Sequence, residues 1–215
     1  KKNYALEPYE GDLKLKGSSL VSRAIEPFGR RFVRKTIGQL LENDIQGIHE
    51  AYLDTRNHII DHKWNDVAEF ARTETLKDSL KKYQRDIGEG KRTRSAPYEL
   101  ALARKRTTLQ PIQKGDRVSY YVAGSADSGP AFESARLAEE WNIDRPDENT
   151  AYYLRRFDDV CSKFEVFFEP HHFRSIFSKE DLFGFDPAPI KIKNQDFPLP
   201  SFLTSTTFEQ DAEEF

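Results

Sequence analysis

Residues 27–41 read PFGRRFVRKTIGQLL, and the hydrophobic period of the chain changes where this stretch begins. Its apolar residues recur at three- and four-residue intervals and share one helical face: Phe28, Phe32, Val33, Ile37, Leu40 and Leu41. Pro27 stands at the first helical position, where proline is tolerated best. The stretch therefore predicts an amphipathic helix with one buried face.

The residues before Pro27 alternate with a period of two instead. Segments 4–6 and 13–16 are separated by Pro8, Gly11 and Asp12, so residues 1–20 predict a β-hairpin. On such a strand Lys14 and Lys16 share one face, because alternate side chains project the same way.

The chain after residue 41 predicts further helices and one clear strand. We expect helices over 45–60, 65–72, within 73–90, from Pro97 to Arg106, and after a cap at 147–150. The last carries an apolar seam of Tyr153, Phe157, Val160, Phe164 and Phe167. Residues 117–123 predict a strand. The fold class is therefore α+β and predominantly helical, with a tail from Glu169 that wraps over the domain or is partly disordered.

Composition excludes several classes of protein. No apolar run is longer than four residues, which excludes a transmembrane helix, and no leader of the secretory kind is visible. Cys161 is the only cysteine, so no internal disulfide framework or multi-cysteine zinc site is expected, and a reducing cytosol is compatible. The chain begins Lys1-Lys2 and contains no methionine, so we expect it to be a piece of a longer polypeptide.

The net charge of −3 hides an asymmetry along the chain. Residues 1–120 hold 24 lysines and arginines against 17 acidic residues, whereas residues 121–215 hold 9 against 19. This distribution is typical of a surface that binds a polyanion, or of two solvated surfaces of opposite charge.

No pattern in the chain resembles a self-sufficient active site. His58 and His62 stand four apart and could be two metal ligands, but no second His/Cys cluster lies near in sequence. We expect His171 and His172 to be surface loop residues and Cys161 to be a small core residue. No glycine-rich phosphate loop or nucleophile elbow is present.

Basic and hydroxyl side chains are the best candidates for a binding surface. Ammonium and guanidinium groups on a hairpin can neutralise phosphates along a duplex and reach acceptors in its minor groove. A second set lies on predicted loops and helix starts, where hydroxyls and arginines commonly bind phosphate. The first set is Lys1, Lys2, Lys14, Lys16, Arg23, Arg30, Arg31, Arg34 and Lys35, and the second is Thr73, Thr75, Lys91, Arg92, Arg94 and Ser95.

Four motifs, in order, carry a resemblance to family B DNA polymerases, and most closely to the bacterial members. Residues 1–5 (KKNYA) resemble the KKxYA signature that closes the palm, and residues 16–23 (KGSSLVSR) resemble the basic segment after it. The helix at 98–103 followed by GDRVSYYV at 115–122 is similar to the thumb pattern of a helix before a G-D-x-V-x-Y-x-V strand. Residues 147–156 resemble the late thumb helix with its YY pair.

The resemblance covers roughly residues 1–170 and implies the end of a palm, a thumb with a small β element near 116–123, and a tail. The implied boundaries are 1–26, 27–176 and 177–215. It implies contacts from Lys1, Lys2, Tyr4, Lys16 and Arg23 to primer–template duplex DNA, and from Thr73, Arg92, Arg94 and Tyr98 on the looser thumb match.

The resemblance also implies what this piece of chain lacks. The family's metal-binding aspartates lie upstream of the KKxYA signature, so Mg²⁺ is expected in the intact polymerase, no catalytic residue in this fragment, and no activity from it alone. Ser22 and Ala24 replace an arginine and the aspartate of the family pattern, which puts in question the salt bridge implied there. The implied location is the bacterial cytoplasm, at the nucleoid.

Two further readings remain open at this point. The acidic second half could dock a basic partner, which would make the chain a helical protein-interaction module without a nucleic-acid role; a metal enzyme built on His58 and His62 is a weaker third reading. Segments 181–183 (DLF) and 195–199 (QDFPL) faintly resemble the peptides by which polymerases engage a sliding clamp, although buried packing is the more common use of such phenylalanines.

Overall fold

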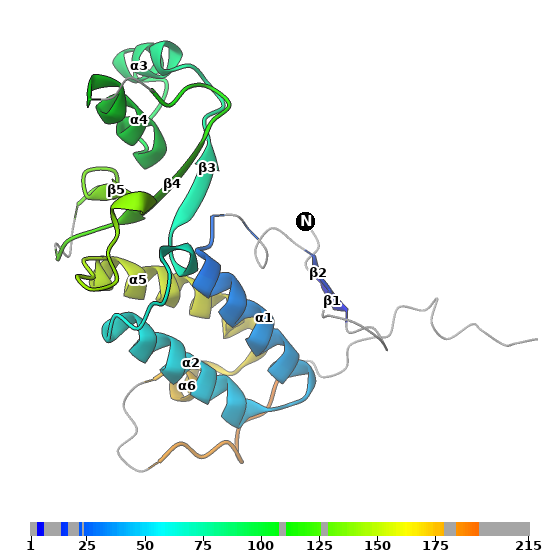
Figure 1. Ribbon diagram of the computed structural model, residues 1–215. Helices are drawn as coiled ribbons and strands as arrows, with labels where there is room; N and C mark the ends of the chain where they lie inside the picture. Colours follow the sequence, from blue (N-terminus) through cyan, green and yellow to red (C-terminus); the bar gives the residue numbers. More distant parts are fainter. Residues whose placement is uncertain are drawn as a thin grey trace, which may run out of the picture.

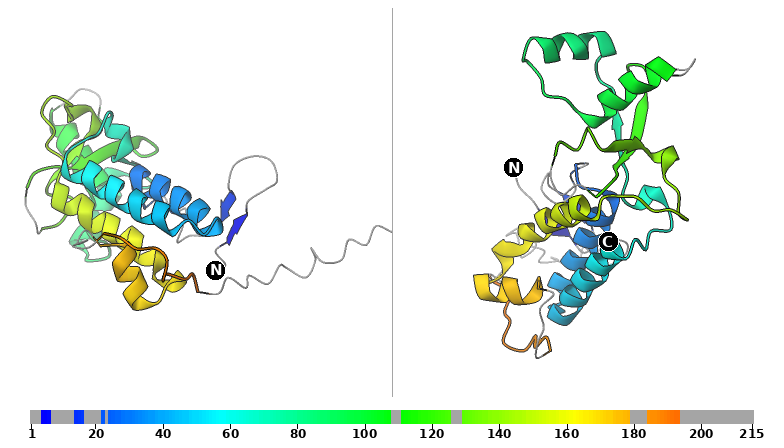
Figure 2. Two further views of the ribbon diagram at one scale, coloured as in Figure 1. Left: turned by 90° about the horizontal axis from the view of Figure 1, so that it is seen from below. Right: turned by 90° about the vertical axis from the view of Figure 1, so that its left-hand side faces the viewer.

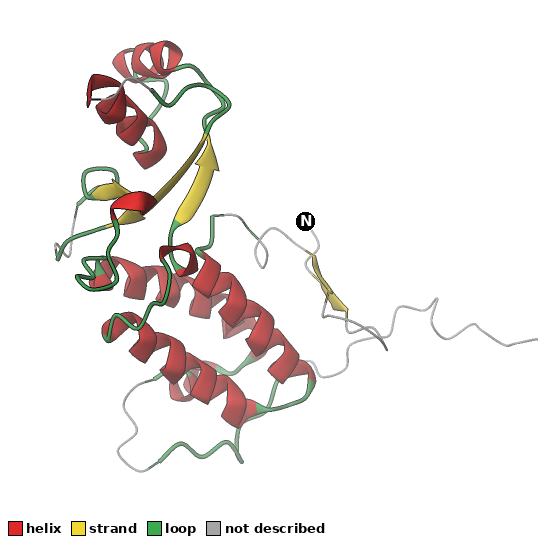
Figure 3. Cartoon of the chain, viewed as in Figure 1, coloured by secondary structure: helices red, strands yellow, loops and turns green. Residues whose placement is uncertain are grey.

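The computed structural model describes residues 4–6, 14–16, 22, 24–107, 111–125, 129–178 and 184–193 of the chain. In these residues it contains six α-helices, a two-stranded sheet and a three-stranded sheet. Figure 1 shows two bodies: a helical base, and α3 with α4 at the far end of a long β ribbon. The predicted fold class, α+β and predominantly helical, is confirmed (Figure 3).

The helical base is built from α1 (Pro27–Leu41), α2 (Ile45–Ile60), α5 (Thr150–Cys161) and α6 (Pro170–Ile176). The chain turns between α1 and α2 at Asn43, whose φ is 57°, and Asp44 then caps α2 by accepting a 2.8 Å hydrogen bond from the Gly47 amide. A Cβ at Gly47 would lie 1.9 Å from Asp44 Oδ2, so this cap requires glycine. The predicted break at residues 43–44 and both flanking helices are confirmed.

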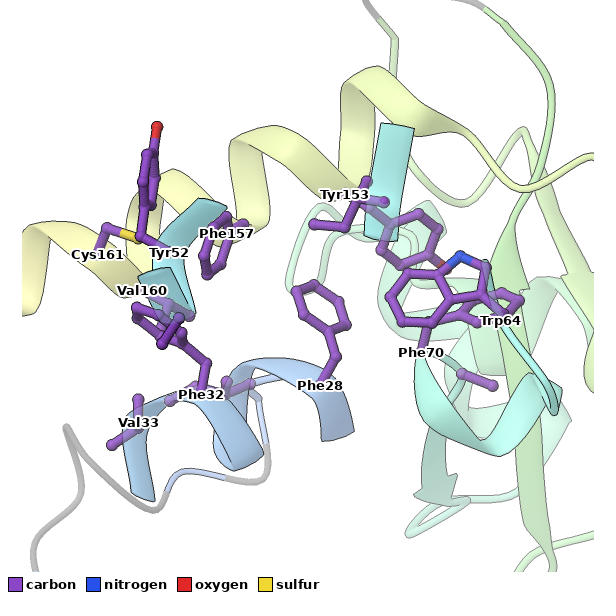
Figure 4. Close-up of a cluster of buried hydrophobic side chains, with 14 of the residues drawn as sticks. Phe28, Phe32, Val33, Tyr52, Trp64, Phe70, Tyr153, Phe157, Val160 and Cys161 are labelled. Carbon is purple, nitrogen blue, oxygen red and sulfur yellow. The ribbon is translucent and has the colours of Figure 1, made fainter. Parts of the chain in front are cut away.

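The core of the base is aromatic. Phe157, fully buried on α5, lies 4.8 Å from the Phe32 ring and 5.7 Å from the Tyr52 ring, centroid to centroid (Figure 4). Phe28 contacts Trp64 at 5.5 Å, and Phe70 contacts Tyr153 at 5.4 Å in an edge-to-face arrangement.

The seam predicted from Tyr153 to Phe167 faces this core, although its helix is shorter than expected. After Cys161 the chain tightens into the 3₁₀ helix η3 (Ser162–Phe167), which keeps Phe164 buried and leaves Phe167 only partly so. Cys161 is 4% exposed, as expected of a small core residue, and burial raises the pKa of its thiol.

The three-stranded sheet has the antiparallel order β3 (Arg72–Thr75), β4 (Arg117–Val122), β5 (Ala135–Leu137). The strand predicted at 117–123 is confirmed as β4. The helix predicted over 65–72 is wrong: only the 3₁₀ helix η1 (Val67–Glu69) forms there. The Asp66 side chain caps η1 by accepting from the Ala68 amide at 2.7 Å. Arg72, the last residue of the predicted helix, is already in β3, where it pairs with Tyr120 of β4.

A distal lobe, residues 76–118, sits at the end of the β3–β4 ribbon and holds α3 (Leu80–Gly88) and α4 (Ala96–Thr107). Its core is small: Leu76, Leu80, Tyr83, Ala96, Tyr98, Ala101 and Val118, together with Tyr120 of β4. The right-hand view of Figure 2 also shows these helices standing away from the base. Within the predicted 73–90 helix, only 80–88 is α-helical, because Ser79 caps it there by accepting from the Lys82 amide at 3.3 Å.

An ion pair joins the start of the base to α5. Arg156 Nε donates to Glu26 Oε1 at 2.9 Å and Nη2 donates to the Ala24 carbonyl at 2.7 Å, while the Glu26 side chain is 1% exposed. Glu26 stands immediately before α1, so this pair fixes the entry of the chain into α1 against α5.

The chain beyond the base returns across it. Ile190 and Ile192 are buried against α2 and α6, Phe185 stacks on His49 at 3.9 Å, and the Lys193 amide donates to the Phe167 carbonyl at 2.7 Å. For residues 184–193 the tail thus wraps over the domain. His171 and His172, expected in a loop, lie on α6.

The predicted hairpin near the start of the chain is present as strands β1 (Tyr4–Leu6) and β2 (Lys14–Lys16), paired antiparallel with Tyr4 opposite Lys16. Among the described residues, no helix is both long enough and apolar enough to cross a membrane.

Candidate nucleic-acid interface

The positive charge of the chain is concentrated on the distal lobe. Residues 76–118 contain twelve lysines and arginines against five acidic residues, whereas residues 1–75 contain equal numbers of each. The whole excess of the first half therefore belongs to the lobe. Ten of its cations are exposed: Lys77, Lys81, Lys82, Arg85, Lys91, Arg94, Lys105, Arg106, Lys114 and Arg117.

Several of these cations are paired with acids on the lobe surface. Glu89 lies 2.7 Å from Lys91 Nζ and 4.0 Å from Arg85 Nε, and Arg85 also contacts Asp86 at 3.3 Å. Exposed pairs of this kind contribute little to stability and are screened by salt. Because the lobe has twelve basic residues and five acidic ones, its net charge stays strongly positive despite these pairs.

Two tyrosine rings form a platform inside the lobe. Tyr83 of α3 and Tyr98 of α4 stack with centroids 4.5 Å apart and planes 17° apart. The guanidinium of Arg92, in the loop between the helices, lies 4.3 Å from the Tyr98 centroid and 5.1 Å from that of Tyr83. Arg92 is thus held on an aromatic surface while its side chain remains 31% exposed.

Hydrogen bonds from the two tyrosines tie the lobe together. The Tyr98 hydroxyl accepts from the Asp78 amide at 2.9 Å. The Tyr83 hydroxyl donates to Glu99 Oε1 at 2.6 Å and accepts from the Ser95 amide at 3.1 Å. Burial, followed by the hydrogen bond to Glu99, raises the pKa of Tyr83.

Tyr98 is 3% exposed, so its ring offers no surface to a ligand. Its side chain packs the lobe and supports Arg92, which corrects the expectation of a direct DNA contact from this ring.

Arg94 and Thr73 occupy exposed positions, but apart from each other. Arg94 is 58% exposed, lies 4.0 Å from Glu99 Oε1, and has its guanidinium 5.8 Å from the Phe132 ring. Thr73 lies on β3, and its hydroxyl is 2.7 Å from the Ser119 hydroxyl across the ribbon. Of the sequence candidates, the structure brings Arg92 and Tyr98 into contact and places Thr73 along the ribbon.

The hairpin candidates are described less fully. Tyr4, Lys14 and Lys16 belong to the separate β1–β2 sheet. Lys1, Lys2 and Arg23 lie outside the described residues, as do the segments 181–183 and 195–199.

An open groove of about 620 Å³ lies where the lobe meets the sheet. Arg104 at the end of α4 and Arg117 at the start of β4 line it, together with Ile112, Leu137 and Glu139. Arg104 Nη1 donates to Glu139 Oε1 at 2.8 Å, which ties α4 to the chain after β5.

Sequence reasoning missed most of the cations on the lobe. Arg104, Lys105 and Arg106 are expected at the end of a helix, where they complement its dipole. Lys81, Lys82 and Lys114 belong to no motif, and Arg117 stands in the GDRVSYYV motif only as part of a strand. The signal that finds them is charge counted over residues 76–118 rather than over half the chain.

The histidines and acids do not form a metal centre in the described residues. α2 carries His58 and ends at Ile60, so His62 lies outside this helix. His62 Nδ1 is 2.6 Å from Glu148 Oε1 and its Nε2 is 3.2 Å from Thr150 Oγ1, so protein groups engage both nitrogens. No three His, Cys, Asp or Glu side chains converge in the described ranges.

No protein-family model matches the chain, and no curated protein matches it.

Proposed function

We propose that this chain binds double-stranded DNA through its distal lobe, as the end of the palm and the thumb of a family B DNA polymerase. The observation that carries the proposal is the concentration of exposed cations on residues 76–118. The four sequence motifs, found in the order that the family has them, support the assignment to family B DNA polymerases. The position of the lobe at the end of a β ribbon suits a part that reaches over a duplex.

The physical basis is phosphate neutralisation. Each Lys or Arg that contacts a phosphate releases condensed counterions, so log affinity falls by about 0.9 for each contact per tenfold increase in salt. Contacts to phosphates position a protein on a duplex without reading its sequence. A thumb built this way holds primer and template for a transfer reaction catalysed by residues outside this chain, in the bacterial cytoplasm at the nucleoid.

Duplex binding by the full chain tests this proposal. We expect anisotropy of a labelled primer–template duplex to report binding that weakens steeply with salt. Neutralising two exposed lobe residues, Lys105→Gln with Arg106→Gln, should weaken it and reduce the salt slope by about two, since the slope counts the phosphates contacted. The matched control neutralises two exposed cations of the base and the tail, Arg174→Gln with Lys191→Gln, and should leave the slope unchanged.

The alternative, an interaction module without a nucleic-acid role, predicts a different outcome. Charge reversal at Lys16 and Arg23 should abolish duplex binding if the hairpin contributes as the resemblance implies. An interaction module would be indifferent to these changes. Undetectable or salt-independent duplex binding by the unaltered chain would overturn the proposed function.

A further inference from the structure

Asp78 bridges two cations on the surface of the distal lobe. Its Oδ1 lies 2.7 Å from Lys82 Nζ, one turn into α3, and its Oδ2 lies 3.1 Å from Arg92 Nη1, in the loop before α4. One carboxylate thus brings an ammonium and a guanidinium from two segments to the same point. The hydrogen bond from Lys82 lowers the pKa of the Asp78 carboxyl, so the carboxylate is charged at neutral pH.

Two contacts with Tyr98 hold this arrangement in place. The Asp78 amide donates to the Tyr98 hydroxyl at 2.9 Å, which fixes the acid relative to α4. The Arg92 guanidinium also lies over the ring of the same Tyr98, 4.3 Å from the ring centroid. The tyrosine rings and the Asp78 carboxylate together therefore hold the Arg92 guanidinium in place.

The bridged cations keep most of their hydrogen-bonding capacity. A guanidinium carries five N–H donors and an ammonium three, and Asp78 accepts from one nitrogen of each. The Lys82 side chain is 49% exposed and that of Arg92 31%. Together Asp78, Lys82 and Arg92 carry a net charge of one positive unit. This charge and the remaining N–H donors suit an anion with several oxygen atoms, such as a phosphate.

We propose that Lys82 and Arg92 form a clamp for one backbone phosphate of bound DNA, and that Asp78 is the positioning residue that holds the two cations together. This inference rests on the proposed function and deepens it by naming one phosphate site. Holding a long side chain in advance removes the entropy that it would otherwise lose on binding.

The direction in which one substitution changes the affinity for DNA shows whether Asp78 positions the two cations or only neutralises part of their charge. Removing an acid from a basic surface raises affinity for DNA, because repulsion of the phosphates falls. If Asp78 positions the clamp, Asp78→Asn should instead lower the affinity for duplex, by about tenfold, the scale of one charge-assisted hydrogen bond.

Glu89 provides the matched control. It lies on the same lobe and also contacts two cations, Lys91 and Arg85, but no aromatic ring supports either of them in the described contacts. Glu89→Gln should raise the affinity slightly. A rise of similar size for Asp78→Asn would overturn the positioning role.

Variants of the two cations test the clamp directly. Arg92→Ala should weaken binding, and adding Asp78→Asn to Arg92→Ala should cause no further loss, because no clamp remains to position. Lys82→Gln should cost more affinity than Lys81→Gln, its exposed neighbour without a place in the clamp; equal losses would contradict the clamp. Circular dichroism and thermal unfolding establish that each variant is folded.

The two proposals fail in different ways. If the unaltered chain does not bind the duplex, the proposed function and the clamp both fall. If the unaltered chain binds and Asp78→Asn behaves like Glu89→Gln, only the clamp falls.

Discussion

The helical base and the distal lobe are stabilised by different means. The base buries a continuous aromatic core around Phe157, with four helices contributing rings or packing against it. The lobe has a core of eight residues, and hydrogen bonds from two tyrosine hydroxyls join its helices. Burial of apolar side chains stabilises the base. The lobe has a much smaller apolar core and exposes ten basic side chains.

The largest effect is expected in the aromatic core. Phe157→Ala should lower the free energy of unfolding by about 3 to 5 kcal/mol, because it removes a fully buried ring and leaves a cavity. Denaturant unfolding followed by circular dichroism measures the change. Leu41→Ala, at a position 41% exposed, should change stability by less than about 0.5 kcal/mol. Similar losses from both variants would contradict a core centred on Phe157.

The Glu26–Arg156 pair should rank next. Arg156→Ala leaves the buried Glu26 carboxylate without its cation, and we expect a loss of about 2 to 3 kcal/mol, less than for fully buried pairs because Arg156 is 27% exposed. Adding Glu26→Gln removes the stranded charge and should recover part of the loss. A double variant no more stable than Arg156→Ala would show that the charge of Glu26 is not what destabilises the single variant.

A smaller, local effect is expected inside the lobe. Tyr83→Phe removes a hydroxyl that serves both Glu99 and the Ser95 amide, at a cost of about 1 to 2 kcal/mol. If the lobe opens as its own unit, hydrogen exchange should accelerate in α3 and α4 but not in α1 or α5. Equal acceleration in both regions would mean that lobe and base unfold together.

The smallest effect concerns pH. Because Lys82, and then Arg92, lower the pKa of Asp78 below its ordinary value of 3.8, their pairing stabilises the lobe at neutral pH. The contribution is fully present above the unfolded carboxyl pKa and is lost as pH falls through the lower folded value. The Asp78 carboxyl carbon should therefore titrate below 3.8 by NMR. Lys82→Gln should move the midpoint back up, whereas Lys81→Gln should not.

Prediction from the sequence succeeded where a pattern is satisfied locally. α1 and α2 follow from apolar spacing, from Pro27 and from the Asn43-Asp44 break, and β4 follows from its β-branched and aromatic residues. It failed at residues 65–72, where only a short 3₁₀ helix forms and Arg72 pairs with Tyr120 on a distant strand. It also failed at α6 (Pro170–Ile176), where no helical period is visible and tertiary packing places Ile176 in a core with Ile190 and Ile192.

Some features of the candidate site follow from the sequence, and others only from the fold. The sequence alone determined that the chain is polar, that its first half is basic, and that Arg92 and Arg94 belong to a basic loop, since charge and composition need no fold to be counted. Only the tertiary structure decided that Tyr98 is buried beneath Arg92 and that Asp78, Lys82 and Arg92 meet. The physical reason is that packing two helices at the end of a ribbon brings side chains from separate segments within hydrogen-bond distance, and no short-range pattern records which ones will meet.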